Sequence, residues 1–392
     1  MLAISRRRPP KNLVRVGRVV AALALLFIFL LGVKGLGDGF KLLSKDLVES
    51  FFRATGNPFV GLIVGILATT LVQSSSVTTA MIVGLFAAPE NPLPLANAIP
   101  MIMGANIGTT VTNTLVSLAH IGRREEFRRA FSAATCHDFF NYMAVLILLP
   151  FELMTGYLRH SAEMMTSLVT GFGVRGVDYE SPLSSILKLA FDPIKNAVSA
   201  VISSQGGRAT ALILISGVFI FTSLMLLVRV MRSMLQSRVE IGLVNVLGKS
   251  GALAIVVGIV VTVMVQSSSI TTSLLIPMAG AGIITLEHIF PITIGANIGT
   301  TVTALMASMA VTGPNAAAGI TIALVHLLFN LTASAIIYPT PAIRRLPLAA
   351  ARGLANVAVR SKTLAITYVF GLFYILPAIV AVIDYVFFVD RS

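Results

Sequence analysis

Charged residues and cysteine are scarce in this sequence. Asp, Glu, Lys and Arg together make up 11% of the 392 residues, whereas a soluble globular protein usually carries about 25%. The single cysteine, Cys136, excludes an internal disulfide and argues against redox chemistry, so we expect it to be a small buried apolar residue. The sequence offers no nucleophile–base pair and no cluster of metal ligands, and we therefore expect that the protein is not an enzyme.

Apolar residues, in contrast, are abundant and gather in long runs. They make up 56% of the chain, and about 20 helical residues are enough to cross a hydrocarbon core of about 30 Å. These runs predict an all-α integral membrane protein that resides in a lipid bilayer. The clearest runs are Val19–Val33, Ala211–Val228, Ala318–Ile337 and Leu364–Phe388.

The net charge of +13 does not indicate nucleic-acid binding. The basic residues lie beside apolar runs instead of forming one soluble face, which is typical of the cytoplasmic loops of membrane proteins. We therefore expect residues 1–18 to be a basic cytoplasmic N-terminus, and the first apolar run to be a membrane anchor rather than a cleaved signal. The basic clusters are Arg6–Arg18, Arg123–Arg129, Arg229–Lys249 and Arg344–Lys362.

The chain contains two related halves, because three motifs occur twice in the same order, about 190 residues apart. Val72–Thr79 (VQSSSVTT) returns as Val265–Thr272 (VQSSSITT), and Gly104–Thr112 (GANIGTTVT) returns unchanged as Gly295–Thr303. Internal repeats are common in transporters, whose substrate site lies where the repeats meet near the middle of the bilayer. The third motif is His137, Phe140 and Asn141, which returns as His326, Phe329 and Asn330.

The loop charges predict that the second half has the opposite orientation in the membrane. The loop Gly122–Arg129 is basic and should lie inside, whereas its counterpart Val311–Asn315 is uncharged and should lie outside. In each half we expect a re-entrant hairpin, whose arms are too short to cross, and a transmembrane helix that is broken at GANIGTT. The predicted fold class is an all-α integral membrane protein with two inverted-topology repeats.

The predicted boundaries follow from this plan. Repeat 1 covers 19–150, with a hairpin at 58–88, a broken helix at 95–119 and a helix at 131–149. Repeat 2 covers 209–339, with a hairpin at 251–280, a broken helix at 286–310 and a helix at 318–337. Between them lies an external loop at 151–208, and after them come a basic cytoplasmic loop at 340–362 and a C-terminal transmembrane helix at 363–392. Pro377 should kink this last helix, and the segments Phe40–Thr55 and Met231–Leu247 should lie along the membrane interface.

The repeated motifs are polar but uncharged, which suits a site for a small anion and a hard cation. The hairpin tips Gln73–Ser76 and Gln266–Ser269 each supply one amide and three hydroxyls. A helix that begins at a tip points its free N–H groups at the site and favours an anion, whereas a helix that ends there presents carbonyl oxygens to a cation. The GANIGTT motifs add side-chain oxygens of the kind that hard cations prefer, from Asn106, Thr109, Asn297, Thr300 and Thr301.

Asp138 is the clearest charged residue within a predicted membrane helix. Such residues are costly and usually functional, and an unpaired carboxylate near the polar site would be an additional cation ligand. The alternative is a carboxylate near the start of its helix, wetted by the basic loop. Asn141 lies about one turn further along roughly the same face. His137 and His326 could orient the site, although histidines that are only hydrogen-bonded in a core are commoner.

These motifs resemble those of the type II sodium–phosphate cotransporters. The QSSS tetrads, the GANIGTT motifs and Arg128–Asn141 (RRAFSAATCHDFFN) carry the resemblance, which covers about Gly56–Pro150 and Gly248–Pro339. It implies a secondary symporter that imports inorganic phosphate with sodium by alternating access. By position, the phosphate ligands would be Gln73, Ser74, Ser75, Ser76, Ser267, Ser268, Ser269, Thr300 and Thr301. The sodium ligands would be Gln266, Ser267, Asn297, Asn106, Thr109, Asp138 and Asn141.

The resemblance also implies an electrogenic cycle, because in this family an Asp at the position of Asp138 accompanies three sodium ions per divalent phosphate. The segment 151–208 has neither a cysteine pair nor an Asn-x-Ser/Thr acceptor, unlike animal members, which indicates a bacterial protein of the inner (plasma) membrane. A homodimer is compatible with the sequence. Two alternatives stay open, namely a sodium-coupled transporter of another small anion, such as sulfate, and an anion channel.

Overall fold

The protein is a bundle of helices. The computed structural model describes residues 11–42, 56–86, 94–171, 182–246, 250–311 and 316–384, and within these ranges it contains no strand. A helix pairs its own backbone groups, which is why long apolar runs in a membrane adopt this form. The helices are α1 (Lys11–Lys41), α3 (Pro58–Val72), α4 (Ser75–Phe86), α5 (Leu95–Thr109), α6 (Val111–Leu118), α7 (Arg124–Thr155), α8 (Tyr157–Gly171), α9 (Pro182–Val201), α10 (Gln205–Val246), α11 (Gly251–Val265), α12 (Ser268–Ser273), α13 (Leu275–Gly280), α14 (Leu286–Ser308), α15 (Ala316–Ile337), α16 (Pro341–Arg360), α17 (Lys362–Phe370), the π-helical segment η1 (Gly371–Ile375) and α18 (Leu376–Asp384).

Several predicted features fall partly outside the described residues. The affected parts are 1–10 of the basic N-terminus, 43–55 of the first interfacial segment, 87–88 of the first hairpin, 172–181 of the external loop, 247–249 of the third basic cluster, 312–315 of the uncharged loop and 385–392 of the last helix.

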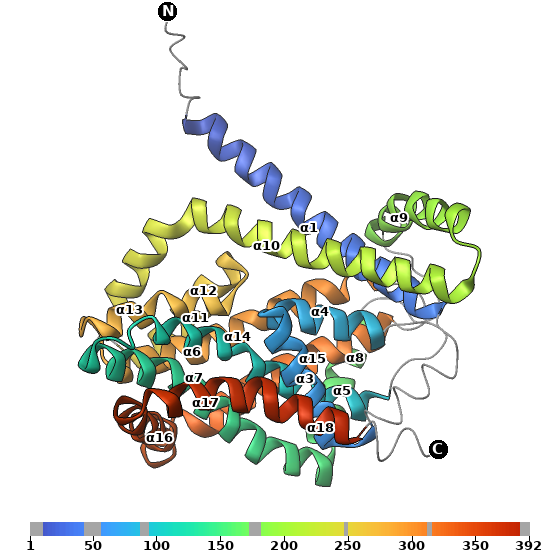
Figure 1. Ribbon diagram of the computed structural model, residues 1–392. Helices are drawn as coiled ribbons and strands as arrows, with labels where there is room; N and C mark the ends of the chain where they lie inside the picture. Colours follow the sequence, from blue (N-terminus) through green and yellow to red (C-terminus); the bar gives the residue numbers. More distant parts are fainter. Residues whose placement is uncertain are drawn as a thin grey trace, which may run out of the picture.

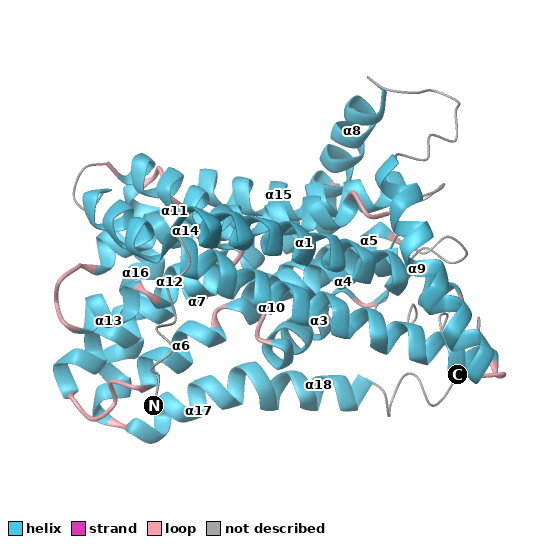
Figure 2. Cartoon of the chain, turned by 90° about the horizontal axis from the view of Figure 1, so that it is seen from above, coloured by secondary structure: helices cyan, strands magenta, loops and turns pink. Residues whose placement is uncertain are grey.

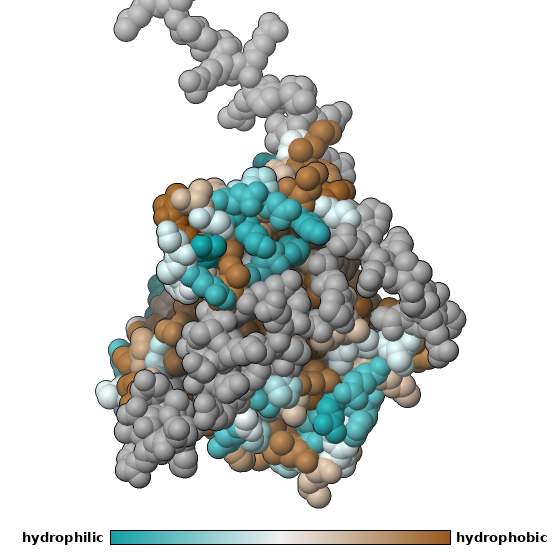
Figure 3. Space-filling model, turned by 90° about the vertical axis from the view of Figure 1, so that its right-hand side faces the viewer, coloured by the Kyte–Doolittle hydropathy of each residue, from teal (hydrophilic) through white to brown (hydrophobic). Residues whose placement is uncertain are grey.

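Among the residues that the structure describes, six helical segments are long and apolar enough to cross a membrane, which confirms the prediction of an all-α membrane protein. Many of their large apolar side chains point outward; Leu146 on α7, for example, is 75% exposed. Figure 3 shows such hydrophobic surface beside hydrophilic patches on the end of the molecule that carries α9. The segments are Val16–Gly39, Arg124–Thr155, Gln205–Leu227, Leu286–Ser308, Ala316–Ile337 and Lys362–Val380.

The long helices run between two ends of the molecule, which differ in charge. In Figures 1 and 2, α13 and α16 lie at one end and α9 lies at the other. The start of α7 packs against α16, so the arginines of Arg124–Arg129 and those of α16 share one end, which we call the basic end. In Figure 1, α1 begins and α10 ends toward this same side, so the elements that carry all four basic clusters gather there.

Glycines bring two equivalent pairs of helices into direct backbone contact. In the first half, a Cβ atom at Gly104 would overlap the backbone carbonyl of Leu62, so α5 lies directly on α3. In the second half, a Cβ atom at Gly295 would overlap the backbone carbonyl of Ile255, so α14 lies on α11 in the same way. Small residues that allow such close approach are typical of helix packing in membranes. The two halves therefore repeat one packing arrangement as well as one set of motifs.

The prediction of a broken helix at 286–310 is wrong, because α14 continues through GANIGTT without interruption. In the first half, the chain leaves the helical pattern only at Thr110, whose backbone keeps right-handed helical angles (φ −74°, ψ −20°). The physical reason is that the glycines serve close packing instead of unwinding. A Cβ atom at Gly299, for example, would lie 2.8 Å from the carbonyl oxygen of Ile259 on α11.

Two further segments differ from the predicted plan. The crossing helix at 211–228 and the interfacial segment at 231–247 form a single helix, α10, because no glycine or proline lies between Gly217 and Gly242 to separate them. The stretch 151–208, predicted as a loop, holds the end of α7 together with α8 and α9.

The last membrane helix contains a π-helical turn directly before Pro377, and the predicted kink stays a prediction. Proline lacks an N–H group and its ring clashes with the carbonyl group four residues earlier. The chain forms the π-helical turn η1 directly before α18, and the Leu376 N–H donates to the carbonyl of Gly371, five residues back.

Candidate functional site

The two glutamines at the start of the QSSS motifs have the same unusual conformation. Gln73 (φ 58°) and Gln266 (φ 57°) are the non-glycine residues with positive φ in the described part of the chain. Each side-chain amide donates to a backbone carbonyl three residues earlier, at 2.5 Å and 2.6 Å, and each amide oxygen accepts from a threonine. Thr112 donates to Gln73 at 3.0 Å and Thr303 donates to Gln266 at 3.1 Å. Strained backbone held by matched bonds in both halves is typical of functional sites.

The serines that follow divide into two kinds. Ser74 and Ser267 cap the next helices, because their hydroxyls accept from the N–H groups of Val77 (3.4 Å) and Ile270 (3.3 Å). The remaining serine hydroxyls have no hydrogen-bond partner among the described residues, so they are available to a ligand. These serines are Ser75, Ser76 and Ser268, which are buried, and Ser269, which is half-buried.

A chain of buried amides crosses between the two halves. His137 Nε2 lies 2.6 Å from Asn297 Oδ1, and the Asn297 amide donates to Asn141 Oδ1 at 2.8 Å. The Asn141 amide donates to the backbone carbonyl of Asn106 at 2.7 Å, and Asn330 donates to Asn106 Oδ1 at 3.2 Å. All five side chains are buried, and they come from α5, α7, α14 and α15. We call these five residues the amide network.

Asn113 on α6 joins the second tip to the amide network. Thr272 and Ser273, which follow the second QSSS motif, donate to Asn113 Oδ1 at 2.9 Å and 3.1 Å. The Asn113 amide lies 3.3 Å from His137 Nδ1. These bonds fit one neutral tautomer, in which His137 donates from Nε2 to Asn297 and accepts at Nδ1 from Asn113. His137 therefore links Asn113 to Asn297 by hydrogen bonds, and a role in orienting the site stays a prediction.

Asp138 follows His137 directly on α7 and is fully buried. Its Oδ2 atom accepts from the hydroxyl of Tyr368 at 2.7 Å and from Thr114 at 3.3 Å. Its Oδ1 atom has no hydrogen-bond partner in the part of the chain that the structure describes. A buried carboxylate oxygen without a partner is costly, and a hard cation would satisfy it.

The threonine hydroxyls of GANIGTT are already hydrogen-bonded within their own helices. Thr109, Thr300 and Thr301 all donate to carbonyls of their own helices, at 2.9, 3.1 and 2.7 Å. Their protons are therefore occupied, and only their oxygen lone pairs remain to face a ligand. Such oxygens suit a cation better than an anion.

The last membrane helix supplies site residues that sequence reasoning missed. Tyr368 donates to Asp138, and Tyr374 accepts from the Gln73 amide at 3.1 Å. Their signal was weak, because the helix lies outside the repeat and tyrosine is common in membrane helices. Thr112 and Thr303, which bond the two glutamines, could have been predicted from the sequence, since both end the repeated GANIGTTVT motif.

Comparison with known families identifies the chain. A family model described as Na+/Pi-cotransporter matches residues 28–176 and 209–339, which together include both tips and the whole amide network. The chain belongs to this family. Its members are transporters rather than enzymes, in agreement with the expectation from the sequence.

Named relatives of this Na+/Pi-cotransporter family member are similar along nearly the whole chain. Sodium-dependent phosphate transport protein 2B of Homo sapiens is 31% identical over 92% of this chain and 64% of its own length. Sodium-dependent phosphate transport protein 2A of Rattus norvegicus is 33% identical over 93% of this chain and 67% of its own length. The chain thus spans about two thirds of the length of these relatives. No solved structure gives a significant match.

Proposed function

We propose that this protein is a secondary active symporter that imports inorganic phosphate together with sodium. Relatives named sodium-dependent phosphate transport proteins support the substrate and the coupling ion. The observation that carries the proposal is the amide network, because it joins buried polar groups from both halves beside the unpartnered oxygen of Asp138. Such a meeting of two repeats near the middle of a membrane is where transporters bind their substrates.

In this proposal the anion and the cations use different groups. The free hydroxyls of Ser75, Ser76, Ser268 and Ser269 would donate to phosphate, and the helices that begin at these tips would add N–H groups. Sodium would take oxygen ligands from Asp138, Asn141 and Asn297 and from the second tip. Asn106, Thr109, Thr300 and Thr301 would contribute oxygen ligands to sodium. Their amide or hydroxyl groups already donate to backbone carbonyls of their own helices.

The proposed mechanism is alternating access between two inverted repeats, each with a re-entrant hairpin, in a bacterial inner membrane with the N-terminus in the cytoplasm. The gathering of the basic clusters at one end supports this orientation. If three sodium ions accompany one divalent phosphate, one net positive charge enters per cycle. At about 2.3 kcal/mol per 100 mV, this charge alone would support roughly fifty-fold accumulation of phosphate.

Uptake of radiolabelled phosphate into proteoliposomes tests the function. We expect uptake with an inward sodium gradient and none when potassium replaces sodium, with inhibition by unlabelled phosphate but not by sulfate. Equal uptake with either cation would refute sodium coupling. Uptake inhibited equally by sulfate would favour the alternative of a general anion transporter, and single-channel currents without sodium would favour an anion channel.

Serine substitutions test the site. We expect Ser268→Ala to abolish uptake, because it removes a proposed donor to phosphate. The fold should be kept, since this buried hydroxyl has no hydrogen-bond partner among the described residues. The matched control is Ser223→Ala on α10, a buried serine that bonds only the carbonyls of Phe219 and Ile220. Similar uptake by both variants, at equal amounts in the membrane, would overturn the assignment of Ser268.

A further inference from the structure

A cavity of about 320 Å³ lies at the basic end of the molecule, away from the amide network. Its wall is formed by the start of α7, the connection between α13 and α14, and α16, so both halves of the chain contribute to it. Ser132 on this wall lies five residues before His137 on α7, or about 7.5 Å along the helix. Glu287 lies ten residues before Asn297 on α14, or about 15 Å.

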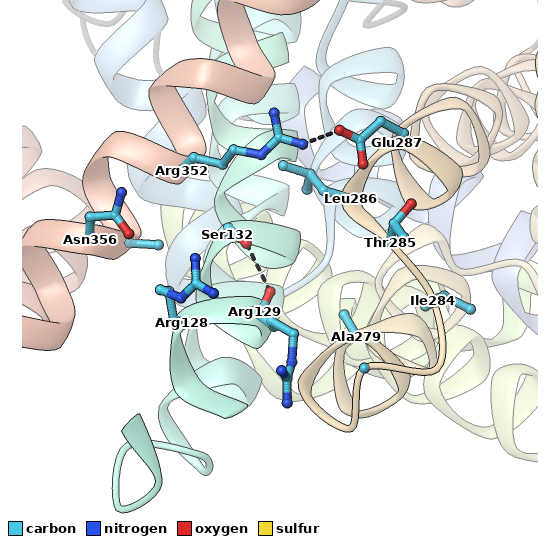
Figure 4. A pocket seen from close by; sticks show the side chains of 12 residues that line it. Arg128, Arg129, Ser132, Ala279, Ile284, Thr285, Leu286, Glu287, Arg352 and Asn356 are labelled. Atoms are coloured by element: carbon cyan, nitrogen blue, oxygen red, sulfur yellow. Dashed lines mark hydrogen bonds and ion pairs between the residues drawn. The ribbon is translucent and has the colours of Figure 1, made fainter. Parts of the chain in front are cut away.

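Three arginines and one glutamate line this cavity, which leaves it basic. In Figure 4, Arg352 lies above the space and Arg128 lies below it, with Asn356 and Thr285 on either side, whereas the Arg129 side chain points down and away from the other two arginines. Arg352 pairs with Glu287 on the wall. Arg128 pairs at 2.9 Å with Glu125, which lies outside the lining.

Arg129 has no acidic partner in the described part of the chain, and its position is fixed from the other half. Its Nε atom donates to the carbonyl of Gly280 at 2.9 Å. Gly280 ends α13, and the turn closes at Gly282, whose positive φ of 76° an L side chain rarely adopts. A Cβ atom at Gly282 would lie 3.5 Å from the Arg129 guanidinium carbon. The turn therefore holds Arg129 at the edge of the space, where its positive charge adds to the basic character of the cavity.

Guanidinium groups bind phosphate oxygens through pairs of parallel hydrogen bonds, and two of them facing one space favour a multiply charged oxyanion. The Asn356 amide adds an uncharged donor to the lining. Since a water molecule takes about 30 Å³ of liquid, the space is larger than a bare phosphate ion requires. It has room for a hydrated phosphate ion or for the phosphate of a lipid headgroup.

We propose that this cavity is a second anion site, which binds a phosphate group at the basic end of the protein. The bound group contacts Arg128 and Arg352 and competes with Glu287 for Arg352. Because α7 belongs to the first half, α14 belongs to the second half and α16 follows the second half, the ligand ties the two halves together. This second site does not depend on the proposal that the protein transports phosphate through the amide network.

Binding to the purified full-length chain in detergent tests the proposal. One arm titrates inorganic phosphate in sodium-free potassium buffer by calorimetry. The other arm titrates short-chain phosphatidic acid, with short-chain phosphatidylcholine as the uncharged-headgroup comparison. We expect at least one of the first two probes to bind. Phosphate binding identifies the free ion as the ligand, and binding of phosphatidic acid alone identifies a lipid headgroup; if neither binds, the proposal is refuted.

Substitutions locate the binding. We expect Arg128→Gln and Arg352→Gln to weaken binding of the successful probe about tenfold, a change of about 1.4 kcal/mol. The matched control is Arg123→Gln, which removes the same charge from the same basic cluster but lies outside the lining and is 78% exposed. Equal weakening by all three variants would mean that only the general positive field acts, and would overturn the site.

A substitution that should strengthen binding distinguishes a specific effect on the site from misfolding. Glu287→Gln removes the carboxylate that occupies Arg352, so we expect it to tighten binding about tenfold. A damaged protein would not gain affinity. Unchanged or weaker binding in Glu287→Gln would contradict the proposed arrangement. Binding needs no transport, so this result and the uptake result of the proposed function stand separately.

Discussion

At the scale of single residues, the environment of Asp138 decides what the site can hold. Tyr368 and Thr114 both donate to Oδ2, while Oδ1 has no partner among the residues described. Hydrogen bonds to a charged group contribute about 1.5–3 kcal/mol, compared with about 0.5–1.5 kcal/mol for neutral pairs. The tyrosine therefore holds the carboxylate in place, and the remaining oxygen stays free for the sodium ion that we propose.

Tyr368→Phe should accordingly lower the free energy of unfolding by about 1.5–3 kcal/mol, because the buried carboxylate loses its shortest hydrogen bond. Tyr142→Phe is the matched control, since it removes only the neutral bond between the two tyrosine hydroxyls, which is 3.2 Å long. Thermal unfolding of both variants in the same detergent compares them. Equal decreases in the free energy of unfolding would show that the bond to Asp138 contributes no more than the neutral bond between the tyrosines.

Asp138→Gly should abolish the current that accompanies transport and leave part of the phosphate uptake. The substitution removes the one carboxylate in the site, and with it the proposed place for an additional sodium ion. The measurement is the charge moved per phosphate in proteoliposomes under a fixed membrane potential. A ratio equal to that of the original protein would refute the role proposed for Asp138, whereas a loss of uptake as well as current would make the carboxylate essential for phosphate binding.

At the scale of secondary-structure elements, the glycines of GANIGTT determine how closely the helices pack. Gly104→Ala places a methyl group against the backbone carbonyl of Leu62, which cannot move without separating α3 from α5. Overpacking of this kind costs about 1–3 kcal/mol or more. Gly353→Ala on α16 is the control, because nothing lies within 4 Å of its Cβ position. We expect it to be neutral or to stabilise by up to about 1 kcal/mol, and thermal unfolding measures both.

The same glycines explain where sequence reasoning succeeded and where it did not. The helices and the two tips could be predicted, because apolar length and short arms leave few alternatives in a membrane. The break at GANIGTT in the second half could not be decided, since glycine permits unwinding and close packing alike. Only the neighbouring helix, with the carbonyl of Ile255 against Gly295, shows which property is used.

For the candidate site, the sequence predicted mainly residues of the repeated motifs. It also predicted Asp138, which has no carboxylate counterpart in the second half, and it missed Thr112 and Thr303, although both belong to a repeated motif. Asn106, Asn141 and Asn297 belong to repeated motifs, and the structure joins them by hydrogen bonds. Tyr368 lies in a helix without a counterpart, so no pattern pointed to it. Tyr368 and Asp138 are 230 residues apart in the sequence. Which residues meet in such a long-range contact depends on packing that local sequence does not encode.

At the scale of the whole molecule, the distribution of charge predicts which end faces the cytoplasm. Cysteine labelling tests this on a Cys136→Ala background, whose native thiol is buried. Ser203→Cys, beside α9, should react with a membrane-impermeant maleimide added outside right-side-out vesicles. Asn356→Cys, at the basic end, should react only after permeabilisation. Both positions are exposed, so a reversed pattern would invert the proposed topology, and labelling of both from outside would refute it.

The amide network also constrains the order in which this protein can be made. A ribosome releases Asn106, His137 and Asn141 into the membrane well before Asn297 and Asn330, to which they are bonded in the finished molecule. Tyr368, the partner of Asp138, comes later still. Until then these groups must be satisfied by water, lipid headgroups or the insertion machinery, since an unpaired polar group in hydrocarbon costs several kcal/mol. We therefore expect the polar centre of the first half to be fully hydrogen-bonded only after the last helix has been made.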